Sequence, residues 1–277
     1  MATISLLSAK GSPGVTTAAV GVSLAWPGVL PGRAALCIDA DPVGGDTAGG
    51  VLRGTLPTAS GMLPLATSRG VRPIDAIDAA SVHLRADGRT RLLAGVPDAA
   101  RAAALGLAWD TITQASEELV ASGTDLLVDA GRVDLSRPPA PWLLDSDLAI
   151  LLVRPTLPSV ASAHRLASDW TASGATTSRI PLGLVVVDAP SSYRPREVAE
   201  AVGLDLVAVI PFDPSSARVH SEGIAAGRGF ARSGYVRALA RLAGDLGRMA
   251  GPQPLGDHGR SPHPGSAVSA APGVDQP

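Results

Sequence analysis

The sequence predicts an α/β protein with a doubly wound, mostly parallel sheet that carries helices on both faces. Short apolar runs alternate with segments of helical periodicity along most of the chain, which is the order that βαβ units require. The apolar runs are mostly continuous, as expected for parallel strands that are covered on both faces. A glycine-containing loop follows the first run and precedes a helical segment, in the position where α/β proteins bind phosphate groups.

The expected elements follow one another in regular order. Strands are predicted at residues 3–8, 34–38, 125–129, 147–153, 182–187 and 205–210, with a further short strand at Leu92-Leu93. Helices are predicted at residues 16–26, 108–121, 158–171, 194–202 and 232–249. Residues 54–90 show few periodic signals. From Gly251 to Pro277 the chain is rich in Gly, Pro, Ser and Ala, which predicts a disordered tail behind one domain of residues 1–250.

Composition narrows the function classes. Hydrophobic residues make up 45% and charged residues 17% of the 277 residues, which supports a sizeable core. A net charge of −2 argues against a general nucleic-acid binder, and 3% aromatic residues disfavour base-stacking platforms. The single cysteine, Cys37, is expected to be a buried thiol. Because no run is apolar over about 18 residues and the N-terminus lacks a signal-peptide pattern, the expected location is cytoplasmic.

The stretch Ser8-Ala9-Lys10-Gly11-Ser12-Pro13-Gly14-Val15-Thr16-Thr17 joins the first strand to the first helix. Its backbone N–H groups and the helix N-terminus are suited to a polyphosphate. In the usual phosphate loop a lysine precedes the Ser/Thr pair, but this position is occupied by Val15. Lys10 is the only lysine among 23 Lys and Arg residues, which indicates that a compact ammonium is needed at the start of the loop.

Carboxylates follow two other predicted strands. Asp39 and Asp41 come after the second strand and precede Gly44-Gly45, and Asp129 ends the strand at residues 125–129. The carboxyl ends of parallel strands form the ligand-binding edge of such a sheet, and the glycines allow close approach of a ligand or subunit. The alternative is that these residues only cap strand-ending turns.

The loop resembles the deviant Walker A motif of the ParA/MinD ATPases, which are P-loop NTPases of the SIMIBI type. The family motif is K-G-G-x-G-K-[ST]-[ST], and its first lysine, the signature lysine, corresponds to Lys10. In the family this lysine reaches the nucleotide of the partner subunit when two subunits sandwich ATP. The departures are Ser12, Pro13 and, above all, Val15 in place of the second lysine, which makes the P-loop degenerate.

Other stretches carry the same resemblance. Residues 39–46 resemble the family element D-x-D-x-x-G-G-[ND], and Asp129 resembles the Walker B aspartate. The run D-A-G-R at residues 129–132 resembles the CpaE/TadZ branch, in which many phosphate loops are degraded. Residues 211–213 match the family Pro-x-Asp near adenine, whereas the family Asn after the preceding strand is Asp188 here. Because an ionised Asp cannot donate to adenine N7 and would suit guanine, this position leaves ATP and GTP open.

The resemblance implies ATP and Mg²⁺ as cofactors and assigns roles to particular residues. Catalytic roles fall to Lys10 and to Asp41, which would orient the attacking water. Metal-binding roles fall to Thr16, Asp39 and Asp129. The nucleotide-binding positions are Lys10, Gly11, Ser12, Pro13, Gly14, Val15, Thr16, Thr17, Asp188, Pro211 and Asp213.

The implied function is a nucleotide-dependent dimerising switch with weak ATP hydrolysis that positions cellular cargo: pilus or secretion machinery, the division site or the chromosome. The alternative is a catalytically inactive pseudo-ATPase scaffold that recruits protein partners, because loss of one cation from a phosphoryl-transfer site commonly costs about 10³–10⁵ in rate. Two further surfaces are not favoured: a membrane, contacted by the last predicted helix, and DNA. The arginines considered for DNA are Arg228, Arg232, Arg237 and Arg241.

Overall fold

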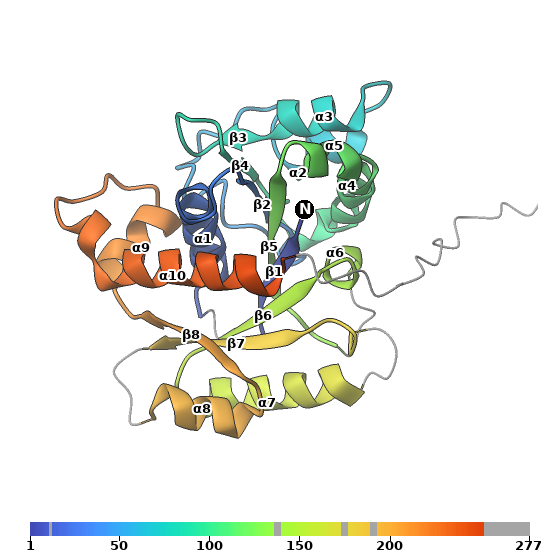
Figure 1. Cartoon of the computed structure of the whole chain (residues 1–277). Coiled ribbons are helices and arrows are strands. Elements are labelled where there is room, and N and C mark those ends of the chain that lie inside the picture. Colours follow the sequence, from blue (N-terminus) through green and yellow to red (C-terminus); the bar gives the residue numbers. More distant parts are fainter. Residues whose placement is uncertain (11–12, 136–139, 173–176, 189–192, 252–277) are drawn as a thin grey trace, which may run out of the picture.

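The computed structural model describes residues 1–10, 13–135, 140–172, 177–188 and 193–251, which form a single eight-stranded sheet with helices on both faces (Figure 1). The strand order is β3-β4-β2-β5-β1-β6-β7-β8, and every pairing is parallel except that of β3 with β4. The strands are β1 (Thr3–Ser8), β2 (Ala34–Asp39), β3 (Val82–His83), β4 (Thr90–Leu93), β5 (Thr124–Arg132), β6 (Leu148–Val153), β7 (Leu182–Asp188) and β8 (Leu206–Pro211).

The helices divide between two apolar clusters, one on each face of the sheet. Helices α1 (Val15–Val29), α9 (Pro214–Ser221) and α10 (Gly234–Met249) cover one face, where α1 and α10 pack side by side (Figure 1). The other helices cover the opposite face. They are α2 (Met62–Thr67), α3 (Pro73–Ala80), α4 (Ala103–Gln114), α5 (Ser116–Ala121), α6 (Pro141–Leu144), α7 (Leu157–Ala172) and α8 (Pro195–Val202).

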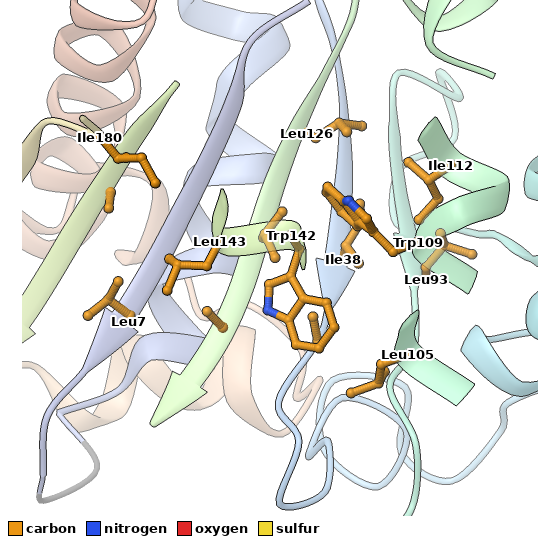
Figure 2. Close-up of a cluster of buried hydrophobic side chains, with 14 of the residues drawn as sticks. Leu7, Ile38, Leu93, Leu105, Trp109, Ile112, Leu126, Trp142, Leu143 and Ile180 are labelled. Atoms are coloured by element: carbon orange, nitrogen blue, oxygen red, sulfur yellow. The ribbon is translucent and has the colours of Figure 1, made fainter. Parts of the chain in front are cut away.

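Strand β1 shows why continuous apolar runs appear in this sequence. All its residues are buried, and its side chains alternate between the two clusters: Ile4 and Leu6 join the cluster under α1, and Leu7 joins the opposite one. Figure 2 shows part of the second cluster, in which the rings of Trp109 and Trp142 lie among aliphatic side chains from the strands. A central parallel strand therefore needs apolar residues at every position.

The fold class and the predicted strands are confirmed, including the short one at Leu92-Leu93, which is part of β4. The helix predicted at residues 108–121 is two helices, α4 and α5, because the backbone at Ala115 (φ −88°, ψ 8°) departs from the helical conformation. Helices α2, α3, α6 and α9 were not predicted. They are short, and α9 buries Ser216 and His220 and therefore shows no apolar periodicity. The tail predicted at residues 251–277 lies outside the described residues from residue 252 onward.

The apolar stripe of the last helix is used for packing. In α10 the side chains of Leu239, Leu242 and Leu246 are buried against α1 and the sheet, so the stripe is not free to lie on a membrane. Within the described ranges, no helix is long and apolar enough to cross a membrane. Cys37 is a free, buried thiol as expected, and burial raises its pKa to about 12.

Candidate functional site

The phosphate-loop region begins where β1 ends and closes at the start of α1. Gly14 precedes the helix with φ 93° and ψ 40°, a left-handed conformation that favours glycine. The first turn of α1 has no acidic residue, and no side chain caps it. The N–H groups of this turn and the helix dipole are therefore available to an anion. Gly11 and Ser12, two of the predicted nucleotide-binding residues, lie outside the described residues.

The two positions that decide the charge of the loop have opposite environments. Val15, where the usual lysine would stand, is buried and belongs to the apolar cluster under α1. Its side chain is part of the core, so only its backbone can face a ligand. Lys10 is exposed, and no described acidic residue forms an ion pair with it. Its ammonium is therefore not neutralised by a carboxylate of the described residues.

Two carboxylates occupy the centre of the sheet edge. Asp39, the last residue of β2, and Asp129, within the C-terminal half of β5, are cross-strand partners, and they are 0% and 1% exposed. Asp39 Oδ2 accepts hydrogen bonds from the hydroxyl (2.6 Å) and the backbone N–H (3.3 Å) of Thr47. Asp129 Oδ1 accepts one from the N–H of Gly131 at 2.9 Å, but its Oδ2 is buried without a hydrogen-bond partner among the described residues.

A second buried aspartate on β5 provides a comparison, because both of its carboxylate oxygens have hydrogen-bond partners. Asp125, near the start of the strand, accepts hydrogen bonds from the N–H of Ala2 (2.6 Å), the indole of Trp26 (2.9 Å) and the guanidinium of Arg33 (2.8 Å through Nε). Its charge is compensated as buried charges normally are. Asp129 has no arginine or indole partner among the described residues, so its charge lacks this compensation, and its Oδ2 is an oxygen suited to a cation.

The pKa values of Asp129 and Asp39 are both raised in this buried environment. Burial raises the pKa of Asp129, and the neighbouring Asp39 carboxyl raises it further. Burial likewise raises the pKa of Asp39, while the bonds from Thr47 oppose the change. The Thr16 side chain, in the first turn of α1, interacts with Asp129 and lowers its pKa, so these three predicted metal-binding residues lie together. Like charges held close in a buried site favour either a shared proton or a bound cation.

These groups suit Mg²⁺ better than a transition metal. In the described part of the chain, no three His, Cys, Asp or Glu residues are grouped as a metal site. Two carboxylates and a hydroxyl form an all-oxygen set of low denticity. Mg²⁺ is usually bound by one or two carboxylates together with waters and substrate phosphates.

Asp41 lies beside the carboxyl pair and is held by its own loop. Its Oδ1 accepts a hydrogen bond from the N–H of Val43 at 2.8 Å, and burial raises its pKa. Its carboxyl packs directly on Gly131, where a Cβ atom would overlap it. Gly45 and Gly95 approach the Asp39 carboxyl equally closely. Glycines thus make the space that the Asp39 and Asp41 carboxyls occupy.

A cavity of about 320 Å³ opens beside the loop (Figure 1 shows α1, β8 and α9, which border it). Its walls include Pro13, Gly14 and Thr17 from the loop region, and Pro211 and Asp213 from the end of β8. The loop region and the Pro-x-Asp element are thereby brought together, as the sequence predicts.

Two predicted base-binding residues have other surroundings in the structure. Asp188 is exposed and does not line this cavity, although its backbone carbonyl accepts the N–H of Phe212 at 2.7 Å. The Asp213 carboxylate caps α9 by accepting from the N–H (3.0 Å) and hydroxyl (2.6 Å) of Ser216 and the hydroxyl (2.7 Å) of Ser215. These bonds hold the pKa of Asp213 below its usual value. Asp213 thus caps α9 and also lines the cavity, and its role toward a base stays a prediction.

Sequence reasoning gave no role to Arg154 and Phe212, which line the cavity, or to Thr47, which holds Asp39. Arg154 follows β6 directly, so its place at the strand edge was the available signal. A second cavity of about 360 Å³ lies between the start of α1 and the loop after β2, and His220 borders it. Burial lowers the pKa of His220 to about 4, and its Nδ1 lies 3.2 Å from the Tyr235 hydroxyl.

Comparison with solved structures finds proteins of similar fold. No family sequence model and no curated protein matches the chain by sequence. The septum site-determining protein MinD of Pyrococcus horikoshii OT3, complexed with Mg-ADP, is 21% identical, and the match covers 90% of this chain and 96% of that one with a TM-score of 0.61. The MinC:MinD cell division complex of Aquifex aeolicus gives 19% identity, coverage of 92% and 98%, and a TM-score of 0.65.

A ParA family ATPase from Chlorobium tepidum TLS is also similar. It is 15% identical, with 88% of this chain and 99% of that chain covered at a TM-score of 0.60. The overall fold is thus shared over nearly the whole of each chain. The chain has the fold of the ParA/MinD-type P-loop ATPases.

Proposed function

We propose that this protein is an ATP-binding switch of the ParA/MinD type, which forms a homodimer when nucleotide binds, hydrolyses ATP weakly and positions cellular cargo. The observation that carries the proposal is the buried pair Asp39 and Asp129 beside the first turn of α1, with one oxygen of Asp129 unpartnered. A purely structural site would have no reason to bury this uncompensated carboxyl. Because ATP is the proposed ligand, the proposed place of action is the cytoplasm.

Each residue has a role in this proposal. Asp129, Asp39 and Thr16 would hold Mg²⁺, and bound Mg²⁺ would neutralise phosphate charge. The N–H groups after Gly14 would bind phosphate oxygens, and Asp41 would orient the attacking water. Exposed Lys10 would contact the nucleotide of the partner subunit, the role that the resemblance gives it.

The environment of Val15 supports slow turnover and favours a second candidate. A buried valine supplies no charge to the transferred phosphoryl group, and such a loss commonly costs about 10³–10⁵ in rate. The second candidate is therefore a pseudo-ATPase scaffold, which recruits protein partners without hydrolysis. The proposed cargo or partner remains within the classes of pilus or secretion machinery, division site or chromosome.

The deciding experiment measures binding of Mg-ATP and Mg-GTP by calorimetry and the oligomeric state on the same samples. We expect micromolar ATP binding with a monomer-to-dimer shift. Lys10→Ala should abolish the shift while leaving monomer binding nearly intact, and Lys10→Arg tests whether the compact ammonium is required. Asp41→Ala should bind and dimerise but not hydrolyse.

Failure of both nucleotides to bind at millimolar concentration would refute the switch. Binding and dimerisation without any turnover would favour the scaffold. In that case, capture of protein partners should depend on ATP, and the Lys10→Ala protein should capture none.

A further inference from the structure

An arginine next to the phosphate loop could supply the positive charge that the loop lacks at Val15. Arg154 stands directly after β6, the strand that pairs with β1 on the side opposite β5. Because parallel strands end at the same edge, this places Arg154 next to the loop that follows β1. It lines the cavity of about 320 Å³ together with Pro13, Gly14 and Thr17.

Arg154 has an uncompensated guanidinium. Its side chain is half-buried, its Nε is buried without a hydrogen-bond partner, and no described acidic residue forms an ion pair with it. The guanidinium lies over the Phe212 ring, with its carbon 5.7 Å from the ring centroid. A half-buried arginine without an acidic partner is costly unless it meets an anion in another state of the protein.

Other charges in the cavity do not satisfy it. The Asp213 carboxylate is already occupied by Ser215 and Ser216 in capping α9. Arg218, the second arginine of the cavity wall, is paired with Glu222 at 2.9 Å. The cavity therefore contains one free cation and one uncapped helix N-terminus among its described walls, and both attract the same kind of ligand.

The rest of the wall suits a molecule with an apolar end. Val187, Ile210 and Tyr235 add apolar and aromatic surface to the same cavity. A nucleotide, with a flat base and a polyphosphate, has use for both kinds of surface.

We infer that Arg154 binds phosphate oxygens of the nucleotide and supplies in this chain the intrasubunit positive charge that Val15 does not provide. The inference rests on the proposed function, because it concerns the same nucleotide. Arg154 is a binding residue here, and its planar guanidinium can make two parallel bonds to a phosphate group.

The test compares Arg154→Gln and Arg154→Lys with the matched control Arg218→Gln, which removes the paired arginine of the same cavity. Affinities for Mg-ADP and for pyrophosphate are measured by calorimetry at two salt concentrations, with circular dichroism to verify folding. We expect Arg154→Gln to weaken both ligands at least tenfold and to flatten the salt dependence. Arg154→Lys should retain part of the affinity, and Arg218→Gln should stay within about twofold of wild type.

Each other outcome has a defined meaning. If wild type binds Mg-ADP and Arg154→Gln binds it equally well, the inference about Arg154 is wrong and the proposed function stands. If Arg154→Gln weakens Mg-ADP but not pyrophosphate, Arg154 contacts the base instead, and the inference is also wrong. If wild type binds neither ligand, the proposed function itself fails.

Discussion

Replacing Asp129 by Asn should stabilise the protein in the absence of ligand, although it removes a proposed metal-binding group. In the folded chain the pKa of Asp129 is raised from the ordinary 3.8 to about 8, chiefly by burial and then by Asp39. The folded state therefore holds a proton that the unfolded chain releases, and stability falls as pH rises from about 4 to about 8. Each pH unit in this window costs about 1.4 kcal/mol, which sets a ceiling of about 4 kcal/mol at pH 7.

The asparagine removes this cost and keeps the useful contacts. Its carbonyl oxygen can still accept the Gly131 N–H, and its amide can donate to the Asp39 carboxyl that faces it across the strands. Because the Asp39 carboxyl is one cause of the raised pKa of Asp129 and remains in the variant, we expect a gain below the ceiling, about 1–3 kcal/mol. For a domain of this size, this corresponds to an increase in Tm of about 2–10 °C.

The assay is thermal unfolding of wild type, Asp129→Asn and Asp129→Ala at pH 5, 7 and 8, with and without Mg-ATP. The advantage of the asparagine should grow with pH. The alanine leaves the Gly131 N–H unpaired and a void, so it should be less stable than the asparagine at every pH. Mg-ATP should raise the Tm of wild type only. An asparagine variant that is less stable than wild type at pH 8 would refute the electrostatic reasoning.

Three further predictions concern other positions. Gly131→Ala should destabilise the protein by roughly 1–2 kcal/mol or more and displace Asp41, because Gly131 has φ 59° and a Cβ there overlaps the Asp41 carboxyl. In the same denaturant titration, the control Gly106→Ala, in open space on α4, should stabilise the protein by about 0.5–1 kcal/mol. His220→Phe should flatten the loss of Tm between pH 6.5 and 4, since the lowered pKa of His220 gives stability that disappears as pH falls; an unchanged acid profile would contradict this. Duplex DNA should not be retained at physiological salt, because the net charge is −2; salt-sensitive binding lost in an Arg237→Glu/Arg241→Glu double variant would overturn that expectation.

The sheet could be predicted from the sequence because most of its strands are short, continuous apolar runs. A central strand is covered on both faces of the sheet, so successive residues such as Ile4, Leu6 and Leu7 are all apolar. The continuous run therefore indicates both a strand and its central position. The carboxylates at strand ends could also be located, since chain order and parallel direction bring Asp39 and Asp129 to one edge.

The rest of the site depended on contacts that no local pattern contains. The burial of Val15 follows from the rotation of α1 on the sheet, and the capping role of Asp213 follows from α9, a helix too short to predict. Arg154 was visible as a strand-following residue, but its lack of an acidic partner is a property of the assembled cavity.

Helices α1, α9 and α10, which cover one face of the sheet, contact one another closely. A Cβ on Gly21 of α1 would overlap the His220 ring of α9, and that ring bonds Tyr235 of α10. Interfaces packed this tightly do not deform gradually. We therefore expect α9 and α10 to move together with the N-terminus of α1, which would couple the proposed nucleotide site to the outer surface of these two helices.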